Sequence, residues 1–301
     1  MTSHLPLVSI GVAVWNGQAY LETALQSLLD QDYKNLEIII LDNQSTDRTA
    51  AICQSLAARD ARIHYILDSQ ERDVMSAQIK VAHLAKGDFY MVACDDDWYD
   101  PYYVSSLLNI LVNHPEVGLA YSGMGLIDSE GYKSAAPPID FLSRTNTPSD
   151  NLRGYLAKRD PAPIVFGLVR THLHLDALKY YKRPDDRGWN HDNLYLMRLM
   201  SQARIEGVKN VLFYYRQQDR RALYEKRRQY YQPANPLLRY VNHILHQWSV
   251  KKAAEKIIDD SSFSPSIKRN LKYSNFCAFL SYIQFKYLRE FIKDSASNWR
   301  S

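Results

Sequence analysis

The sequence of 301 residues contains only three cysteines, and no two of them form a Cys-x-x-Cys pair. Cys53, Cys94 and Cys277 lie far apart, so neither a disulfide framework nor a zinc ribbon is supported. No stretch reaches the roughly 18 consecutive apolar residues that cross a bilayer. Residues 1–4 also lack the basic start and apolar core of a signal peptide. We therefore expect a protein that is made and kept in the cytoplasm.

Two common nucleotide-binding motifs are missing as well. The sequence has neither Gly-x-Gly-x-x-Gly nor Gly-x-x-x-x-Gly-Lys-Ser/Thr, so a dinucleotide oxidoreductase or a P-loop NTPase loses its main signature. The amino-acid composition is ordinary for a folded chain, with 46% hydrophobic and 23% charged residues. These proportions exclude a disordered or collagen-like chain.

Charge is divided unevenly along the chain. Residues 1–150 carry 9 Lys or Arg against 20 Asp or Glu, a net charge of −11, whereas residues 151–301 carry 28 against 13, a net charge of +15. An acidic half can hold a cation, and a basic half can face phosphate, nucleic acid or an anionic membrane. The two halves are therefore expected to have different electrostatic tasks.

Apolar, β-branched runs alternate with segments of helical periodicity. The run at 7–14 is typical of a strand buried on both faces, and apolar residues recur at helical spacing over 20–31. This alternation predicts an α/β fold with a mainly parallel central sheet flanked by helices. The same patterns predict strands at 36–41, 63–67, 88–94, 164–169 and 211–215, helices ending near 59, 85 and 201, an irregular connection at 134–150, and a helical, basic region from about 220.

Two acidic clusters follow predicted strands, and ligands of such sheets lie beyond the carboxyl ends of the strands. Asp95, Asp96 and Asp97 are adjacent, so they repel one another unless a cation or strong donors neutralise them. If the segment is extended, Asp95 and Asp97 share a face and can hold one divalent cation. The alternative is a solvated acidic turn. Asp42 likewise suits a base or ribose contact, although aspartate is common in turns.

Several segments together resemble family 2 glycosyltransferases. They are residues 8–17, 27–33, 37–47, 85–89 and 95–101, five motifs in the family's order over about 100 residues. The resemblance weakens after about residue 130 and is faint beyond 216. It implies a GT-A fold, a nucleotide-diphosphate-sugar donor, a divalent metal (Mg²⁺ or Mn²⁺) on the diphosphate, and inversion at the anomeric carbon.

The resemblance also assigns roles to individual residues. It places Asp95 and Asp97 at the metal, with the register within 95–97 left open. It places these residues at the nucleotide: Val14, Trp15, Asn16, Asp42, Asp95 and Asp96. Two departures leave the identity of the nucleotide open: the family's usual Pro-Val-Tyr-Asn is Ala-Val-Trp-Asn at 13–16, and a frequent acidic residue is Gln18 here.

Residues 188–194 resemble the acceptor-side motif, in which a carboxylate opens a helix. The usual Glu-Asp is His191-Asp192 here. The resemblance implies that Asp192 is the catalytic base, with Trp189 and His191 on the acceptor side. Helix capping is the alternative role for Asp192. Asp185 and Asp186 are less favoured because neither opens a helix with an apolar stripe.

We divide the chain into a glycosyltransferase domain, 1–219, and a helical basic extension, 220–301. Within the domain, 1–130 is expected to bind nucleotide and metal, and 131–219 the acceptor. In the extension, apolar residues at helical spacing with nearby lysine and arginine suit either a membrane interface or an ordinary core-facing helix. That spacing is shared by Phe276, Phe279, Leu280, Ile283, Tyr287 and Phe291.

The sequence thus predicts an inverting, metal-assisted transferase that moves a sugar from its nucleotide donor to a hydroxyl acceptor. Cell-surface polysaccharide or glycolipid synthesis is the expected setting, and a saccharide or lipid-linked acceptor is the expected partner. We expect no nucleic-acid partner. Location at the inner face of the cell membrane is an alternative to a purely cytoplasmic one. The rival hypothesis is a catalytically silent nucleotide-sugar-binding subunit of a larger assembly.

Overall fold

The computed structural model describes most of the chain in six stretches. They are residues 5–70, 74–135, 147–158, 163–180, 191–217 and 236–282. The chain divides into two compact units, which are described separately. The first comprises 1–146, 161–179 and 203–218, and the second comprises 147–160, 180–202 and 219–301. The predicted boundary at residue 219 stays a prediction.

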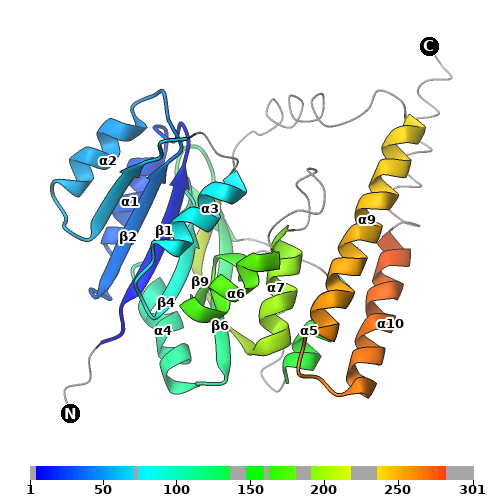
Figure 1. Ribbon diagram of the computed structural model, residues 1–301. Helices are drawn as coiled ribbons and strands as arrows, with labels where there is room; N and C mark the ends of the chain where they lie inside the picture. Colours follow the sequence, from blue (N-terminus) through cyan, green and yellow to red (C-terminus); the bar gives the residue numbers. More distant parts are fainter. Residues whose placement is uncertain are drawn as a thin grey trace. The chain divides into compact units, whose positions relative to one another are not determined.

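The first unit is built on a sheet whose first four strands are all parallel, as the sequence predicts. These strands are β1 (Val8–Val14), β2 (Leu36–Asp42), β3 (Ile63–Leu67) and β4 (Phe89–Ala93), in the order β3-β2-β1-β4 (Figure 1). β1 and β2 are almost completely buried, which explains their continuous apolar runs. The chain moves outward from β1 to β3 and then returns to the other side of β1. The topological switch therefore lies between β1 and β4.

Beyond β4 the sheet becomes mixed, which the predicted strands alone did not show. It continues through β8 (Leu168–Arg170), β6 (Val117–Ile127), β9 (Arg204–Arg216) and β5 (Trp98–Tyr99), while β7 (Lys133–Ala135) pairs with β6. β8 runs antiparallel to both of its neighbours, whereas β6 and β9 are parallel to each other.

The strand predicted at 164–169 is only partly present. Ile164–Phe166 forms a 3₁₀ turn, and the strand begins at Leu168. The amide of Gly167 donates to the carbonyl of Ile164, which closes the turn. A short apolar run fits a buried turn as well as a strand, so its hydrophobicity was not decisive.

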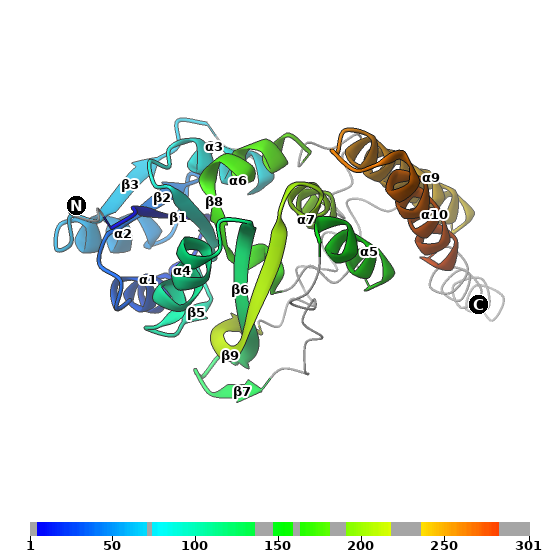
Figure 2. The same ribbon diagram turned by 90° about the horizontal axis from the view of Figure 1, so that it is seen from below.

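Helices cover both faces of this sheet. On one face α1 (Leu21–Leu29), α2 (Thr49–Ala57) and α4 (Tyr103–Asn113) share a core with β1 and β2. The other face carries α3 (Val74–His83) and α6 (Thr171–Ala177) (Figure 2). There α3 packs on β2, and His174 of α6 stacks on Tyr90 of β4. The first unit is therefore a three-layer α/β structure, as predicted.

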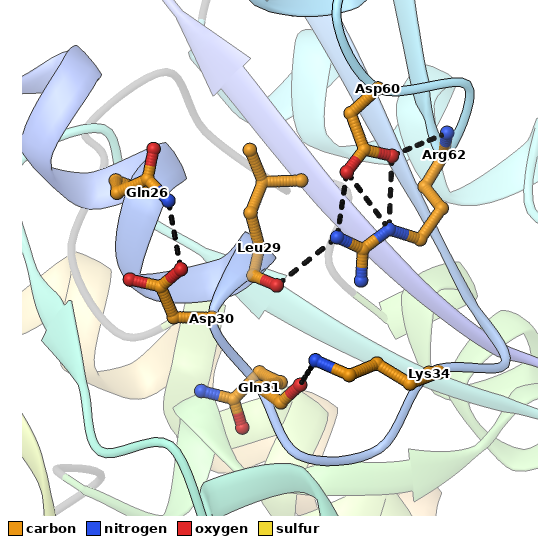
Figure 3. Close-up of polar contacts among 7 residues, drawn as sticks. All are labelled: Gln26, Leu29, Asp30, Gln31, Lys34, Asp60 and Arg62. Atoms are coloured by element: carbon orange, nitrogen blue, oxygen red, sulfur yellow. Dashed lines mark hydrogen bonds and ion pairs between the residues drawn. The ribbon is translucent and has the colours of Figure 1, made fainter.

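The carboxyl end of α1 is secured by cations from the neighbouring loops (Figure 3). The guanidinium of Arg62 donates to the carbonyl of Leu29 at 3.1 Å and makes two-pronged contacts with Asp60, while Lys34 Nζ donates to the carbonyl of Gln31 at 2.7 Å. Cations are favourable where a helix presents its last carbonyls. Arg62 also holds the pKa of Asp60 down at about 2, chiefly through its hydrogen bonds.

The second unit is helical in its described parts. It contains α5 (Pro148–Lys158), α7 (His191–Gln202), α9 (Pro236–Asp259) and α10 (Pro265–Tyr282). α9 and α10 lie side by side as a hairpin, α5 packs on α7 and α10, and α7 packs on α9 (Figure 1). α5 occupies the end of the connection that was predicted to be irregular. Among the helices in the described ranges, none has both the length and the apolar character needed to span a membrane.

Candidate functional site

Three loops come together at the carboxyl ends of the parallel strands. They follow β1, β2 and β4, and they carry Asn16, Asp42 and the aspartates at 95–97. This edge, at the switch point between β1 and β4, is where open α/β sheets bind ligands. The structure thus brings together most of the residues that the resemblance assigned to the nucleotide and the metal.

The loop after β1 is fastened to the loop after β2. The amide of Asn16 donates to Ser45 Oγ at 2.9 Å, and Asn16 Oδ1 accepts from the amide of Thr46 at 2.8 Å. The amide of Gly17 donates to Thr49 Oγ1 at 2.9 Å. Asn16 has a φ of 53°, a left-handed conformation that asparagine tolerates better than most residues. These bonds define the shape of the loop before any ligand arrives.

Neighbouring side chains in this loop differ sharply in exposure. Val14 is buried in the core, whereas Trp15 is 58% exposed. An exposed tryptophan at the carboxyl edge of the sheet offers a flat apolar surface, and such a surface can stack on a ring.

Asp42 is fully buried at the end of β2. Its Oδ1 accepts from the amide of Ser45 at 2.8 Å, and its Oδ2 accepts from the hydroxyl of Tyr65 at 3.0 Å. Burial, and then the hydrogen bond to Asp42, raise the pKa of Tyr65, so this hydroxyl stays protonated and remains a donor. Each carboxylate oxygen has two lone pairs, so this pair of donors leaves acceptor capacity for another group.

The acidic cluster is not an extended segment. The chain bends at Asp95 and Asp96, so the expected alternation of faces does not apply. The atoms that do gather are one each from Cys94, Asp96 and Asp97, all within 4.8 Å of one another, and both carboxylates are buried. Asp95 lies instead close to Gly17, so the loop after β4 approaches the loop after β1 here.

The carboxylates of this cluster suit a hard divalent cation, but the thiol does not. Burial, and then the charges of Asp97, Asp96 and Asp95, raise the pKa of Cys94, so the thiol stays protonated. Mg²⁺ and Mn²⁺ take oxygen ligands, and Mg²⁺ is commonly held by one or two carboxylates together with substrate phosphates. Asp96 and Asp97 fit that pattern. The metal assignment to Asp95 and Asp97 stays a prediction.

Arg216 is the residue of this site that sequence reasoning missed. It is 3% exposed at the end of β9, where its amide donates to Asp97 Oδ1 at 2.9 Å. Its guanidinium donates to the carbonyls of Asp96 and Asp128, both at 2.6 Å, and lies 4.2 Å from the ring centroid of Tyr20. A buried cation beside the aspartates offsets part of their charge. Arg216 opened a basic run in the sequence, and nothing there indicated that the chain would bring it to residue 96.

A second feature beside the acidic cluster was also missed. Trp98 and Tyr214 are cross-strand partners on β5 and β9, and the ammonium of Lys133 lies 2.7 Å from the Trp98 ring centroid and 4.6 Å from that of Tyr214. Desolvation at this place lowers the pKa of Lys133. The cation–π contacts connect β7 to β5 and β9 immediately after Asp97.

Replacing Gly17 tests how closely the loop after β1 approaches the loop after β4. A Cβ on this residue would meet Asp95 Oδ2 and, at 2.7 Å, Val14 Cγ2. We expect Gly17→Ala to displace the Asp95 carboxylate and to lower the unfolding free energy by about 1–3 kcal/mol. Thermal unfolding and Mn²⁺ titration measure the two effects. Gly131→Ala is the comparison, because no atom lies within 4 Å of a Cβ there although φ is +91°; equal metal affinity in Gly17→Ala and wild type would contradict the packing argument.

On the acceptor side, α7 begins at His191 and places Asp192 in its first turn. The apolar stripe predicted for this helix is confirmed, because Leu196, Leu199 and Met200 are buried. The hydroxyl of Tyr155 on α5 donates to Asn193 Oδ1 at 2.7 Å and so braces this end of the helix. Trp189, Asp185 and Asp186 lie outside the described residues.

The three-layer fold and the carboxylates at its switch point agree with the GT-A fold that the resemblance implies. The family model "Glycosyl transferase family 2" matches residues 9–170, which is more than half of the chain. The chain therefore belongs to glycosyl transferase family 2.

Among curated relatives, the chain is 33% identical over 129 residues to the GalNAc(5)-diNAcBac-PP-undecaprenol beta-1,3-glucosyltransferase of Campylobacter jejuni. The match covers 42% of this chain and 40% of that protein. Across the first three relatives the matched part ranges from 15% to 75% of their own length.

Two solved structures extend the likeness over nearly the whole chain. S. aureus TarS 1-349 in complex with UDP-GlcNAc matches with a TM-score of 0.64 and 14% identity, over 91% of this chain and 73% of that one. The mannosyltransferase PcManGT from Pyrobaculum calidifontis in complex with GDP-Man and Mn2+ matches with a TM-score of 0.56 and 16% identity, over 98% and 81%. At such identities the likeness establishes the fold, which is the predicted GT-A fold.

Proposed function

We propose that this protein transfers a sugar from a nucleotide-diphosphate donor to a hydroxyl acceptor, with inversion and with help from a divalent cation. The observation that carries the proposal is the meeting of three loops at the switch point: Asp42 is buried, the 16–17 loop is fastened to the Asp42 loop, and Asp95 lies close to Gly17. One edge then offers acceptors for a base and carboxylates for a cation.

In this proposal the nucleotide lies along the loop after β1. Asp42 accepts a hydrogen bond from the base or ribose, because its oxygens retain acceptor capacity beside Ser45 and Tyr65. The backbone of Val14 to Asn16 borders the nucleotide, and the exposed ring of Trp15 supplies an apolar surface. UDP is the first nucleotide to test, because the UDP-GlcNAc complex of TarS has the same fold.

The diphosphate lies at the acidic cluster, where Asp97, with Asp95 or Asp96, would hold a divalent cation. When bound, such a cation supplies Lewis-acid stabilisation of the leaving diphosphate. Arg216 keeps Asp96 and Asp97 in place through one hydrogen bond to the carbonyl of Asp96 and one to Asp97 Oδ1, and it offsets their charge. The Mn2+ complex of the archaeal mannosyltransferase supports a metal in this fold.

The acceptor side is assigned to residues 131–219, as the resemblance implies. Asp192 takes the proton from the acceptor hydroxyl as that oxygen attacks the anomeric carbon from the face opposite the diphosphate. A single displacement of this kind inverts the configuration. Trp189 and His191 are proposed to line the acceptor site beside this base.

A saccharide on a lipid carrier is the acceptor class that we favour, within cell-surface polysaccharide or glycolipid synthesis. The support is the Campylobacter relative, whose name specifies an undecaprenol-linked acceptor. That match covers 42% of this chain, and the acceptor is proposed by kinship rather than by contacts.

Thermal-shift screening of nucleotide diphosphates with and without Mn²⁺ tests the donor site, because a ligand of the native state raises its stability. We expect one base to stabilise the protein more than the others, and only with Mn²⁺. In Asp42→Asn, loss of a charged hydrogen bond worth about 1.5–3 kcal/mol should weaken that nucleotide roughly 10–100-fold. Tyr65→Phe is the control, because it removes a hydrogen bond to the same carboxylate but keeps its charge. Unchanged nucleotide binding in Asp42→Asn would refute the base contact.

The rival hypothesis, a catalytically silent nucleotide-sugar-binding subunit, predicts the same thermal shifts. Donor hydrolysis or sugar transfer by the purified protein separates the two hypotheses. Binding without either reaction, with lipid-linked and free saccharide acceptors both supplied, would favour the silent subunit.

A further inference from the structure

The α9–α10 hairpin of the second unit has a well-packed inner side. On α9 the buried apolar residues are Val250, Ala254, Ile257 and Ile258, and on α10 they are Leu271 and Phe279. Asn275, also fully buried, donates from Nδ2 to the carbonyl of Lys251 at 3.1 Å and ties the two helices together. The hairpin is therefore a folded element with a packed inner side, and its other residues form an outer side.

That outer side is apolar where exposed helices usually carry charge. On α9, Leu245 is 57% and Trp248 42% exposed, and on α10, Tyr273 is 69%, Phe276 41% and Leu280 40% exposed. On each helix these residues are three or four positions apart, so they line one face. We call these five residues the outer stripe.

The two halves of the outer stripe border a common lysine. The ammonium of Lys251 lies 4.6 Å from the ring centroid of Trp248 and 5.7 Å from that of Phe276, so both rings border the same lysine. Trp248 also makes an edge contact with Phe279, with centroids 5.5 Å apart. The exposed rings of Trp248 on α9 and Phe276 on α10 thus flank one lysine.

Exposed lysine and arginine side chains lie near the outer stripe on both helices. Lys252 and Lys256 are exposed at helical spacing after Trp248, and Arg269 is exposed four residues before Tyr273. Lys252 Nζ lies 5.7 Å from the Trp248 ring centroid. The whole region 220–301 carries 16 Lys or Arg against 6 Asp or Glu, a net charge of +10.

We propose that the outer stripe of α9 and α10 docks on an anionic membrane surface. Exposed Trp, Tyr and Phe rings beside lysines are the composition that binds at a lipid–water interface, where the rings enter the headgroup region and the cations meet anionic lipids. The sequence left a membrane interface and a core-facing helix open for this spacing; Phe276 and Leu280 are exposed, whereas Phe279 packs inward at 7% exposure. Ile283, Tyr287 and Phe291 lie outside the described residues.

Co-sedimentation of the full chain with vesicles tests the proposal without any sugar transfer, so its failure is distinct from failure of the proposed function. We expect binding to vesicles of phosphatidylcholine with phosphatidylglycerol, weaker binding at higher salt, and little binding to phosphatidylcholine alone. Trp248→Ser with Phe276→Ser should lower the partition coefficient about tenfold or more, because apolar area entering the interface is lost. Lys252→Glu with Lys256→Glu should do so through charge alone, without altering the rings.

Val112→Ser with Lys209→Glu is the matched control, because it changes an exposed apolar residue and an exposed lysine in the first unit. It should bind like wild type. The proposal is overturned if wild type ignores anionic vesicles, or if both pairs of stripe variants bind as well as the control. It is also overturned if sedimentation velocity reveals a dimer that Trp248→Ser abolishes while vesicle binding persists, because the occupant of the stripe is then a second copy.

Discussion

Replacing Asp192 by asparagine is expected to lower kcat about 10²–10⁴-fold while donor affinity stays nearly unchanged. A positioned base contributes a factor of this size, and an amide cannot take the proton of the acceptor hydroxyl. Asp192 lies in the first turn of α7, where an asparagine is tolerated, so the fold should persist. Steady-state kinetics with the donor and acceptor, together with calorimetric titration of the nucleotide, measure the two quantities.

The matched control is Asp150→Asn, the same chemical change in the first turn of α5 within the same unit. It should leave kcat within about twofold of wild type if only the base matters. Sugar transfer by Asp192→Asn at a rate near that of wild type would place the base elsewhere. Asp185 and Asp186 are then the next residues to replace.

Replacing Asp97 by asparagine is expected to weaken metal-dependent nucleotide binding at least about 100-fold, since a charged ligand is lost from the metal. The substitution keeps an oxygen that can accept from the amide of Arg216, so this 2.9 Å contact and the local fold should survive. Calorimetry with the nucleotide diphosphate, in Mn²⁺ and in EDTA, gives the affinity in each state.

Two variants sharpen this test. Cys94→Ser should keep its affinity, because Mg²⁺ and Mn²⁺ prefer carboxylate and phosphate oxygens to sulfur. Asp30→Asn, an exposed carboxylate at the end of α1, controls for loss of charge alone. If diphosphate binding is as strong in EDTA as in Mn²⁺ and is unaffected in Asp97→Asn, the metal assignment fails. Comparison of Asp95→Asn with Asp96→Asn then decides the register within the cluster.

Local sequence signals predicted the parallel strands of the first unit well. Buried parallel strands need continuous apolar runs, so β1 and β2 were recognisable, and their carboxyl ends placed Asn16, Asp42 and the aspartates at one edge. Each of these features depends on residues that are close together in the chain. The outer stripe was only half predictable, because helical spacing finds Phe276 and Phe279 alike, whereas packing against Trp248 buries only the second.

By itself the sequence determined the order of strands and helices in the first hundred residues, the α/β class, and the edge of the sheet that carries Asp42 and the acidic cluster. Tertiary structure alone decided that Arg216, 120 positions after Asp96, would bond to its carbonyl, and that a bend would group Asp96 with Asp97. It also decided the mixed pairing of β8, β6 and β9. The reason is physical: periodicity reports which side of an element is buried, but contacts between distant segments depend on how all the elements pack together.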